Sequence, residues 1–148
     1  MTIARELVYA ALYAKVQALQ GAGVFKTVGR RLYHWSDVAP ELHPACYLAQ
    51  ERETAVTNAS GIPLHYRLHC SIYVYVWQAN VGQAPAPALN VCLDAIETAL
   101  KAAPGREVQD LGYPDRVRHC FVDGEIVTDE GTLGDRAVAI VPIVIVVA

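Results

Sequence analysis

The last twelve residues, Ala137 to Ala148 (AVAIVPIVIVVA), contain no charged or hydrogen-bonding side chain. Valine and isoleucine dominate this segment and favour β-strands, and the segment is shorter than the roughly 20 residues that a membrane-spanning helix needs. A strand with one face in water alternates apolar and polar residues, whereas this strand offers apolar side chains to both faces. A helix of the same chain can cover one face. We expect the other face to be covered by a second layer or by a neighbouring subunit.

Pro142 lies in the middle of this terminal segment. Proline cannot donate a hydrogen bond to a sheet ladder, so we expect it at a β-bulge or at an edge position. The strand itself is expected to be a central or near-central member of one sheet, because of the placement of two helices and of a hairpin before it in the chain.

Composition extends the argument for contacts between subunits. The length of 148 residues predicts a single domain spanning 1–148. Apolar residues make up 53% of the chain and charged residues 18%, which is more apolar and less charged than an average soluble domain. This excess favours buried subunit interfaces, and a well-packed monomer is the alternative interpretation.

The charge distribution argues against a nucleic-acid-binding protein. The net charge is −3, and Arg30-Arg31 is the only adjacent basic pair, so a dominant phosphate-binding surface is not expected. We expect no signal peptide, because no basic segment followed by an apolar core stands at the N-terminus, and no membrane partner. The four cysteines are far apart and form no Cys-x-x-Cys, so they are interpreted as reduced core thiols of a cytosolic protein.

Two segments have the apolar periodicity of helices. We expect the first to run from an N-cap at Thr2 to about Leu19 and to be terminated by Gly21. Its apolar residues cover most of its circumference, which is typical of a helix buried on more than one side. The second, from about Ala88 to Ala102, has one narrow apolar stripe and is expected to cover one face of a sheet.

Strands account for most of the remaining chain. The clearest runs from Leu64 to Gln78, where side chains alternate with period two over fifteen residues. Asp123-Gly124 is a strong signal for a two-residue hairpin turn. Further strands are expected at Phe25–Trp35, Ala45–Gln50, Val117–Val122, Glu125–Thr128 and Ala137–Ala148. Polar segments are interpreted as loops at Glu51–Gly61, Ala79–Pro87 and Asp129–Arg136.

The order of these elements is α-β-β-β-α-β-β-β. Strands that occur in runs around two helices indicate an α+β fold. We therefore expect a mixed, mainly antiparallel sheet with two helices packed on one of its faces.

No residue pattern in the sequence indicates catalysis. His65 and His69 lie on one strand face, but four residues along a strand separate them by about 13 Å, too far to share a metal ion. His119 and Cys120 are adjacent and point to opposite faces. The carboxylates between 123 and 135 are interpreted as a solvated hairpin rather than as a cation site. Glycine-rich phosphate loops and the Gly-x-Ser-x-Gly motif are absent from the sequence, so we expect a protein that is not an enzyme and has no cofactor or metal.

Candidate contact surfaces come from aromatic, apolar and loop residues. Aromatic residues contribute strongly to interfaces, and packing under a helix or loop is the alternative for those on the long strand. Candidate subunit contacts are Tyr73, Tyr75 and Trp77 on this strand and Val8, Leu12 and Val16 on the first helix. Long polar loops often carry function. These loops contain the candidate contacts to partner proteins, or to the lumen of an assembly: Arg52, Glu53, Asn58, Gln83, Asp129, Glu130 and Asp135.

The order of elements and several stretches resemble the minor tail protein U and tail terminator group of tailed bacteriophages. The similar stretches begin with TIARELVYAALYAKVQAL and FKTVGRRLYHWSDV, continue through PACYLAQ, LHYRLHCSIYVYVW and LNVCLDAIETAL, and end with HCFVDGEIVTDEGTLGDRAVAIVPIVIVVA. The resemblance covers nearly the whole chain, and related tail-completion proteins share the same layout.

This resemblance implies a structural virion protein without enzyme activity. The subunit would close into a six-membered ring at the head-proximal end of the tail, after assembly in the host cytoplasm. Its partners would be other copies of itself, the tail tube protein and the head–tail connector proteins, with DNA passing through the lumen only as cargo. The near-neutral to acidic charge balance suits this role, because DNA would slide rather than bind.

Two other functions fit parts of the sequence. A small-ligand-binding regulatory module of the α+β class would explain the fold and the missing catalytic set, but not the apolar first helix. A cysteine- or histidine-dependent hydrolase would need Cys46, Cys70, Cys92 or Cys120 as its nucleophile, or one of the histidines.

Overall fold

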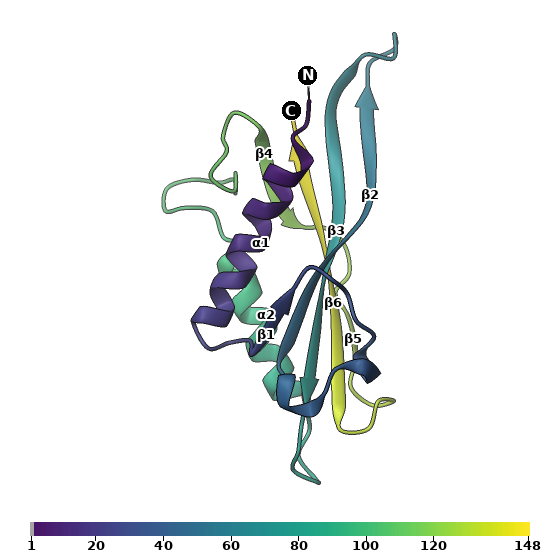
Figure 1. Ribbon diagram of the computed structural model, residues 1–148. Helices are drawn as coiled ribbons and strands as arrows, with labels where there is room; N and C mark the ends of the chain where they lie inside the picture. Colours follow the sequence, from purple (N-terminus) through teal and green to yellow (C-terminus); the bar gives the residue numbers. More distant parts are fainter. Residues whose placement is uncertain (1) are drawn as a thin grey trace.

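The computed structural model describes residues 2–148 (Figure 1). In chain order, the elements are α1 (Arg5–Gly21), β1 (Thr27–Gly29), the 3₁₀ turns η1 (Trp35–Asp37) and η2 (Pro40–Leu42), β2 (Ala45–Thr57), β3 (Pro63–Trp77), α2 (Ala86–Ala99), β4 (Val117–Val122), β5 (Val127–Asp129) and β6 (Arg136–Val147). The order of helices and strands is the predicted α-β-β-β-α-β-β-β, and the α+β class is confirmed.

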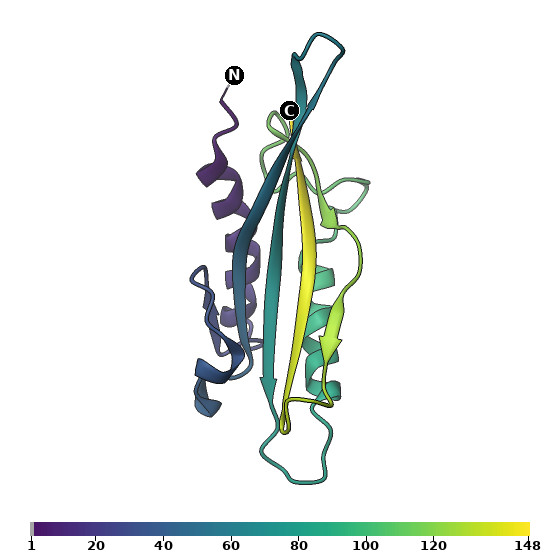
Figure 2. The same ribbon diagram turned by 90° about the vertical axis from the view of Figure 1, so that its right-hand side faces the viewer.

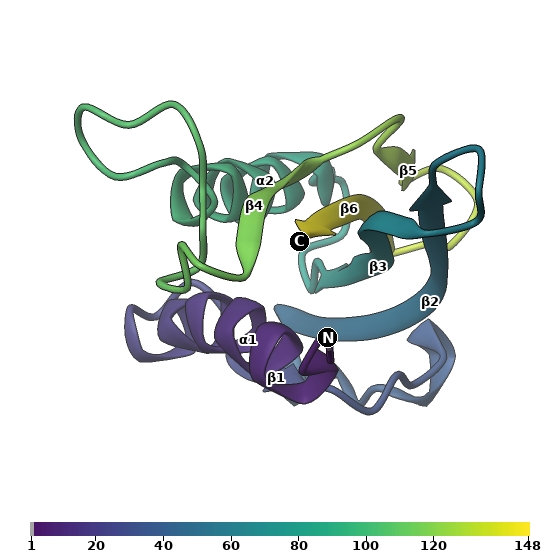
Figure 3. The ribbon, with the colours of Figure 1, turned by 90° about the horizontal axis from the view of Figure 1, so that it is seen from above.

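The strands form one open sheet with the order β1-β2-β3-β6-β4, and β5 also pairs with β6. β1 runs parallel to β2, and the other pairs are antiparallel, so the sheet is mixed and mainly antiparallel, as predicted. Both helices lie on the same face of this sheet (Figure 1, Figure 3). We call this helix-covered face the inner face and the opposite one the outer face.

The apolar terminal segment forms β6, which lies between β3 on one side and β4 and β5 on the other. Its predicted near-central position is therefore confirmed. The inner-face residues are no more than 1% exposed: Ala137, Ala139, Val141, Ile143, Ile145 and Val147. On the outer face, Val138, Ile140 and Val146 remain partly exposed and Val144 is buried. The single chain thus covers one face of this strand fully and the other only in part.

Pro142 lies where the strands beside β6 are interrupted. β4 pairs with β6 residues 143–147 and β5 with residues 138–140. The Pro142 carbonyl points toward this interruption and accepts a hydrogen bond from the backbone N–H of Asp123 at 3.1 Å. A residue without an N–H is tolerated at such a break in the ladder, which agrees with the expected bulge or edge position.

The predicted hairpin at Asp123-Gly124 is wrong. β4 and β5 do not pair with each other, but follow one another along the same side of β6. Gly124 has a φ of 106°, which glycine adopts easily, and its turn links two stretches of one interrupted strand. Both stretches pack against the long apolar β6, which offers each of them more cross-strand contact than the other could.

β2 and β3 form a long hairpin that projects beyond the helices (Figure 1, Figure 2). The segment Glu51–Gly61 was expected to be a loop, but β2 extends to Thr57, and only residues 58–62 form the turn. Most side chains of this extension are exposed on both faces of the strand. Its sequence therefore lacks alternating apolar residues, and its polar composition is like that of a loop. We call residues 52–67 the arm.

Two predictions near the N-terminus are also wrong. α1 begins at Arg5, after Ala4 with a left-handed φ of 57°, and no side chain caps it, so Thr2 is not the N-cap. The strand expected at Phe25–Trp35 is reduced to the three residues of β1. The next segment, residues 30–44, leaves the sheet and packs over part of the outer face. We call it the covering loop.

Candidate assembly surfaces

The outer face carries an aromatic cluster that the covering loop partly covers. Val38 from the loop is buried together with Ala45, Tyr47 and Tyr75, and Trp35, Tyr73 and Val138 pack against them. Of the three aromatic residues proposed as subunit contacts, Tyr75 is 4% exposed, whereas Tyr73 and Trp77 are partly exposed. Tyr75 therefore packs under a loop, and Tyr73 and Trp77 keep surface that a partner could reach.

Side chains of the strands hold the covering loop on this face. The Tyr75 hydroxyl donates to the Tyr33 carbonyl at 2.6 Å. The Arg136 guanidinium donates to the carbonyls of Trp35 and Val38 and lies 5.7 Å from the centre of the Trp35 ring. Burial raises the pKa of Tyr75 to about 12, so its hydroxyl stays protonated and keeps donating well above neutral pH.

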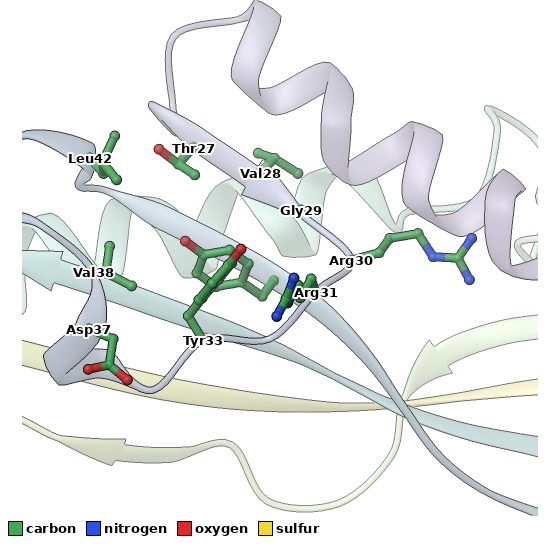
Figure 4. A pocket seen from close by; sticks show the side chains of 10 residues that line it. Thr27, Val28, Gly29, Arg30, Arg31, Tyr33, Asp37, Val38 and Leu42 are labelled. Carbon is green, nitrogen blue, oxygen red and sulfur yellow. The ribbon is translucent and has the colours of Figure 1, made fainter.

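Two open hollows lie beside the covering loop. The larger one, of about 420 Å³, lies between the loop and β1 and β2, where Arg31 and Tyr33 face it (Figure 4). The rings of Tyr33 and Tyr47 meet edge to face with their centres 5.6 Å apart, and the Arg31 guanidinium lies 5.6 Å from the Tyr33 centre. The second hollow, of about 360 Å³, is lined by Leu32, Tyr33, His34, Trp35, Tyr73, Tyr75, Val138 and Ile140.

The three α1 residues expected to contact another subunit lie in the core of the chain itself. Val8 and Leu12 are 0% exposed and Val16 is 1% exposed, because they pack between the helix and the inner face. They have no surface available to a neighbour, so the expectation does not fit this burial. The apolar residues of α1 that are open to solvent lie elsewhere on the helix: Leu7, Ala10, Ala14 and Ala18.

Two of the three arm residues expected to contact partners bind other parts of the same chain. Glu53 lies in β2 and accepts from the Arg5 guanidinium through both carboxylate oxygens, at 2.6 and 2.8 Å. Asn58 stabilises the turn of the arm, where its side-chain oxygen accepts from two backbone N–H groups at 2.9 and 3.0 Å. Arg52 is different, since its side chain is 67% exposed.

Two loop carboxylates stabilise the end of the molecule opposite the arm. Glu130 accepts from the backbone N–H of Ala86 at 2.8 Å, at the start of α2, where a helix leaves N–H groups without partners. Asp135 accepts from the indole N–H of Trp77 at 2.6 Å. The same bond also restrains the indole, which lies at the end of β3.

The remaining loop residues stabilise their own turns. Asp129 accepts from the backbone N–H and the hydroxyl of Thr132, and these hydrogen bonds lower the pKa of its carboxyl group. Gln83 accepts from the Asn80 side chain at 3.3 Å. Of the seven predicted loop contacts, Arg52 is thus the one whose described contacts leave it most available to a partner, because its nearest carboxylate oxygen is 3.9 Å away.

The titratable groups offer no activated nucleophile. All four cysteines are free and buried, and burial raises the pKa of each thiol, to about 11 for Cys92 and to about 12 for Cys120. A reactive thiol has a lowered pKa instead. Within residues 2–148, histidine, cysteine and carboxylate side chains form no group of three that could hold a metal ion. No helix in the described part of the chain is long and apolar enough to cross a membrane.

The covering loop is the part of this surface that the sequence analysis missed. Tyr33 and Trp35 fit an alternating strand pattern, and their partners Tyr75 and Arg136 are far away in the sequence. Arg136 was a usable signal, because a cation at the start of an otherwise apolar strand needs carbonyl or carboxylate partners nearby.

This arrangement has a counterpart among solved structures. A chain of the virion of a native gene transfer agent (GTA) particle is similar to this chain, with a TM-score of 0.53 over 93% of this chain and 92% of that chain. The two sequences are 13% identical, so the likeness concerns the fold. No protein-family model matches the chain, and no curated protein matches it.

Proposed function

We propose that this chain is a structural subunit of a phage-like virion, with the role of a tail terminator or tail-completion protein. In this role, copies of the chain close into a ring, expected to have six members, that caps the tail tube and joins it to the head–tail connector proteins. The subunit works by assembly rather than by catalysis, and DNA passes through the lumen of the ring.

The likeness to a virion chain over almost the whole length carries this proposal. The resemblance of the sequence to the tail terminator group adds the finer assignment. The surface of the subunit is consistent with both, because exposed apolar residues lie on several separate elements. They include Leu7 on α1, Ile62 and Leu64 on the arm, Val91 on α2 and Val127 on β5. Head-to-tail contacts in a ring need two different patches on each copy.

Electron microscopy of the purified protein, alone and mixed with tail tubes of the same particle, tests the proposal. We expect rings of one size, and density at one end of the tubes. Light scattering should give about 97 kDa for a ring of six copies of 16.1 kDa. A protein that stays monomeric at high concentration and also in the presence of tail tubes would contradict the proposal.

The larger hollow beside the covering loop favours a second candidate, a small-ligand-binding regulatory module. Its volume of about 420 Å³ falls in the range of ligand pockets, and Arg31 with two tyrosine rings could hold a planar or anionic molecule. A thermal-shift screen with metabolites tests this candidate. Clear stabilisation of the wild type that is lost in an Arg31→Ala, Tyr33→Ala variant would support it, and no stabilisation by any compound would count against it.

A further inference from the structure

The tip of the arm has apolar side chains with no cover in its own chain. Ile62 is 58% exposed and Leu64 is 53% exposed, and together with Tyr66 and Ala148 they border an open hollow of about 330 Å³. The arm projects beyond both helices (Figure 1, Figure 2), so neither helix of the same chain reaches over these residues. An isolated projecting hairpin gains little from its own contacts, and its apolar tip is suited to contact with another molecule.

A matching depression lies at the opposite edge of the sheet. Between α2 and the interruption that separates β4 from β5, a hollow of about 190 Å³ is lined by Leu93, Ile96, Glu97, Val122, Ile126 and Val141. We call it the edge notch. It exists because β4 ends at Val122 and β5 begins only at Val127, which leaves that stretch of β6 without a neighbouring strand on the side opposite β3. Ile126 at its rim is 44% exposed.

The charges of the arm and of the edge notch are opposite. Asp123 and Glu125 lie between Val122 and Ile126 at the rim of the notch, and residues 119–135 contain no lysine or arginine. Glu97 lines the notch from the other side. The arm contains Arg52 and Arg67 with one carboxylate, Glu53, which Arg5 already neutralises. Arg67 lies 3.9 Å from Asp123 of its own chain. Arg52 lies at the same distance from Glu51, but its side chain is 67% exposed against 36% for Arg67, so Arg52 is the more accessible cation of the arm.

We propose that the tip of the arm of one copy docks into the edge notch of the next copy. Ile62 and Leu64 contact Ile126 and the apolar lining of the notch, while Arg52, which pairs with His69 farther along the arm, adds positive charge at longer range to a contact with an acidic rim. The two patches differ and lie on separate parts of the molecule, so the contact is head-to-tail, which is the kind that generates rings. As the contact of a ring, this inference rests on the proposed function and names the surfaces that the ring would use.

Cysteine cross-linking between two variants tests the contact directly. One variant has Ile62→Cys and the other Ile126→Cys, both at exposed positions, whereas the four native cysteines are buried and unreactive. We expect an equimolar mixture to form a disulfide-linked dimer upon mild oxidation, and each variant alone to remain uncrosslinked. Cross-linking of the Ile62→Cys variant alone would indicate a symmetric arm-to-arm contact and would overturn the inference.

Charge and polarity variants test the same contact without a covalent bond. Ile62→Asp should weaken self-association by about tenfold or more, because a carboxylate replaces an apolar side chain at an acidic notch. Val81→Asp is the matched control, since Val81 is fully exposed in the loop before α2, and it should leave association unchanged. Arg52→Glu should also weaken association, but less than Ile62→Asp does, because Arg52 pairs with His69 away from the tip and acts at longer range. Circular dichroism confirms that each variant is folded.

The outcomes separate this inference from the proposed function. Rings that form and cap tail tubes while the Ile62 and Ile126 variants fail to cross-link would overturn the docking contact and leave the virion role intact. A monomeric protein in all conditions would overturn both. Cross-linking in the mixture, together with weakened association of Ile62→Asp but not of Val81→Asp, would support the contact.

Discussion

At the scale of single residues, the buried thiols make the stability of the fold depend on pH. An unfolded cysteine ionises near a pKa of about 8.5, whereas folding raises the pKa of Cys92 to about 11 and that of Cys120 to about 12. Between these values the folded state holds more protons than the unfolded state, so the free energy of unfolding falls as the pH rises. Urea unfolding should show the full thiol contribution below about pH 8 and a decline between about pH 9 and 11.

Alanine variants of these two cysteines provide the control for this pH dependence. Cys92→Ala and Cys120→Ala should each show a shallower decline above about pH 9 than the wild type, because one titrating group is removed. Each variant should also be slightly less stable at neutral pH, because removal of the buried sulfur atom leaves a small cavity. A decline as steep as in the wild type would show that thiol ionisation is not its cause.

The hydroxyl of Tyr75 is expected to contribute to stability through the covering loop. It donates to the Tyr33 carbonyl from a nearly buried position, and Tyr75→Phe leaves that carbonyl without this donor. The expected loss in the free energy of unfolding is about 1 kcal/mol. Tyr73→Phe is the control, because the Tyr73 hydroxyl forms no side-chain hydrogen bond with any of residues 2–148, and it should be close to neutral. Equal effects of the two substitutions in urea unfolding would contradict this role of the loop.

At the scale of elements, the two faces of β6 should respond differently to a charge. Ile145 is 0% exposed on the inner face, so Ile145→Asp buries a carboxylate without a partner and should destabilise the fold by more than about 4 kcal/mol. Ile140 lies on the outer face and is partly exposed, so Ile140→Asp should remain folded. Its effect is expected in assembly, because the outer face loses apolar surface beside the second hollow.

Circular dichroism and electron microscopy of both variants check this difference. Ile145→Asp should lose its cooperative thermal transition, whereas Ile140→Asp should keep it and form fewer rings or tube caps than the wild type. Val144 is not a suitable probe of the outer face, since it is 2% exposed there. If Ile140→Asp unfolded as readily as Ile145→Asp, the outer face would be as fully packed in the single chain as the inner face.

The sequence predicted correctly those elements in which the pattern of apolar residues follows the pattern of buried positions. β3, α2 and β6 have a period or an apolar run that their burial in the structure reproduces. The errors have a different origin. The extension of β2 into the arm is exposed on both faces, so its sequence has no apolar period. The Asp-Gly dipeptide indicates a hairpin only if its two flanking strands pair with each other, and here both pair with β6 instead.

The candidate contacts were predicted less well than the fold, because composition does not tell a core from an interface. The apolar side chains of Val8, Leu12 and Val16 are buried in the core of their own subunit. Ile62 and Ile126 are as apolar in the sequence as core residues, although the structure leaves both exposed. Their exposure follows from the arm and from the gap between β4 and β5, which only the tertiary structure reveals.

At the scale of the whole molecule, the subunit combines a complete inner core with an incompletely covered outer face. The buried cluster between the helices and the sheet includes residues of both helices and most strands, so each copy can fold before it assembles. The apolar arm tip lies outside this core, and the edge notch opens onto its margin, where Ile96 and Val141 belong to the core and Ile126 is exposed. Assembly is therefore expected to be reversible, dependent on concentration and separable from folding by substitutions on the surface.

Mixing experiments with an arm variant provide a test of this separation. In a head-to-tail ring each copy donates its arm once and accepts an arm once. An Ile62→Asp copy can still accept an arm through its edge notch, but it donates its own at least about tenfold more weakly, so near the wild-type association threshold it ends a growing chain of subunits. If one quarter of the copies carry the substitution and a closed ring needs six competent copies, the yield of closed rings should fall to about 18% of the wild-type yield.

Electron microscopy or native mass spectrometry of such mixtures measures this yield. The same fraction of Val81→Asp copies should leave the yield unchanged, because Val81 lies on neither patch. A yield that falls only in proportion to the fraction of Ile62→Asp copies would mean that rings tolerate a missing arm contact, and closure would then depend on other surfaces. The steep fall is expected because a single copy that cannot donate its arm interrupts the only cycle of contacts that closes the ring.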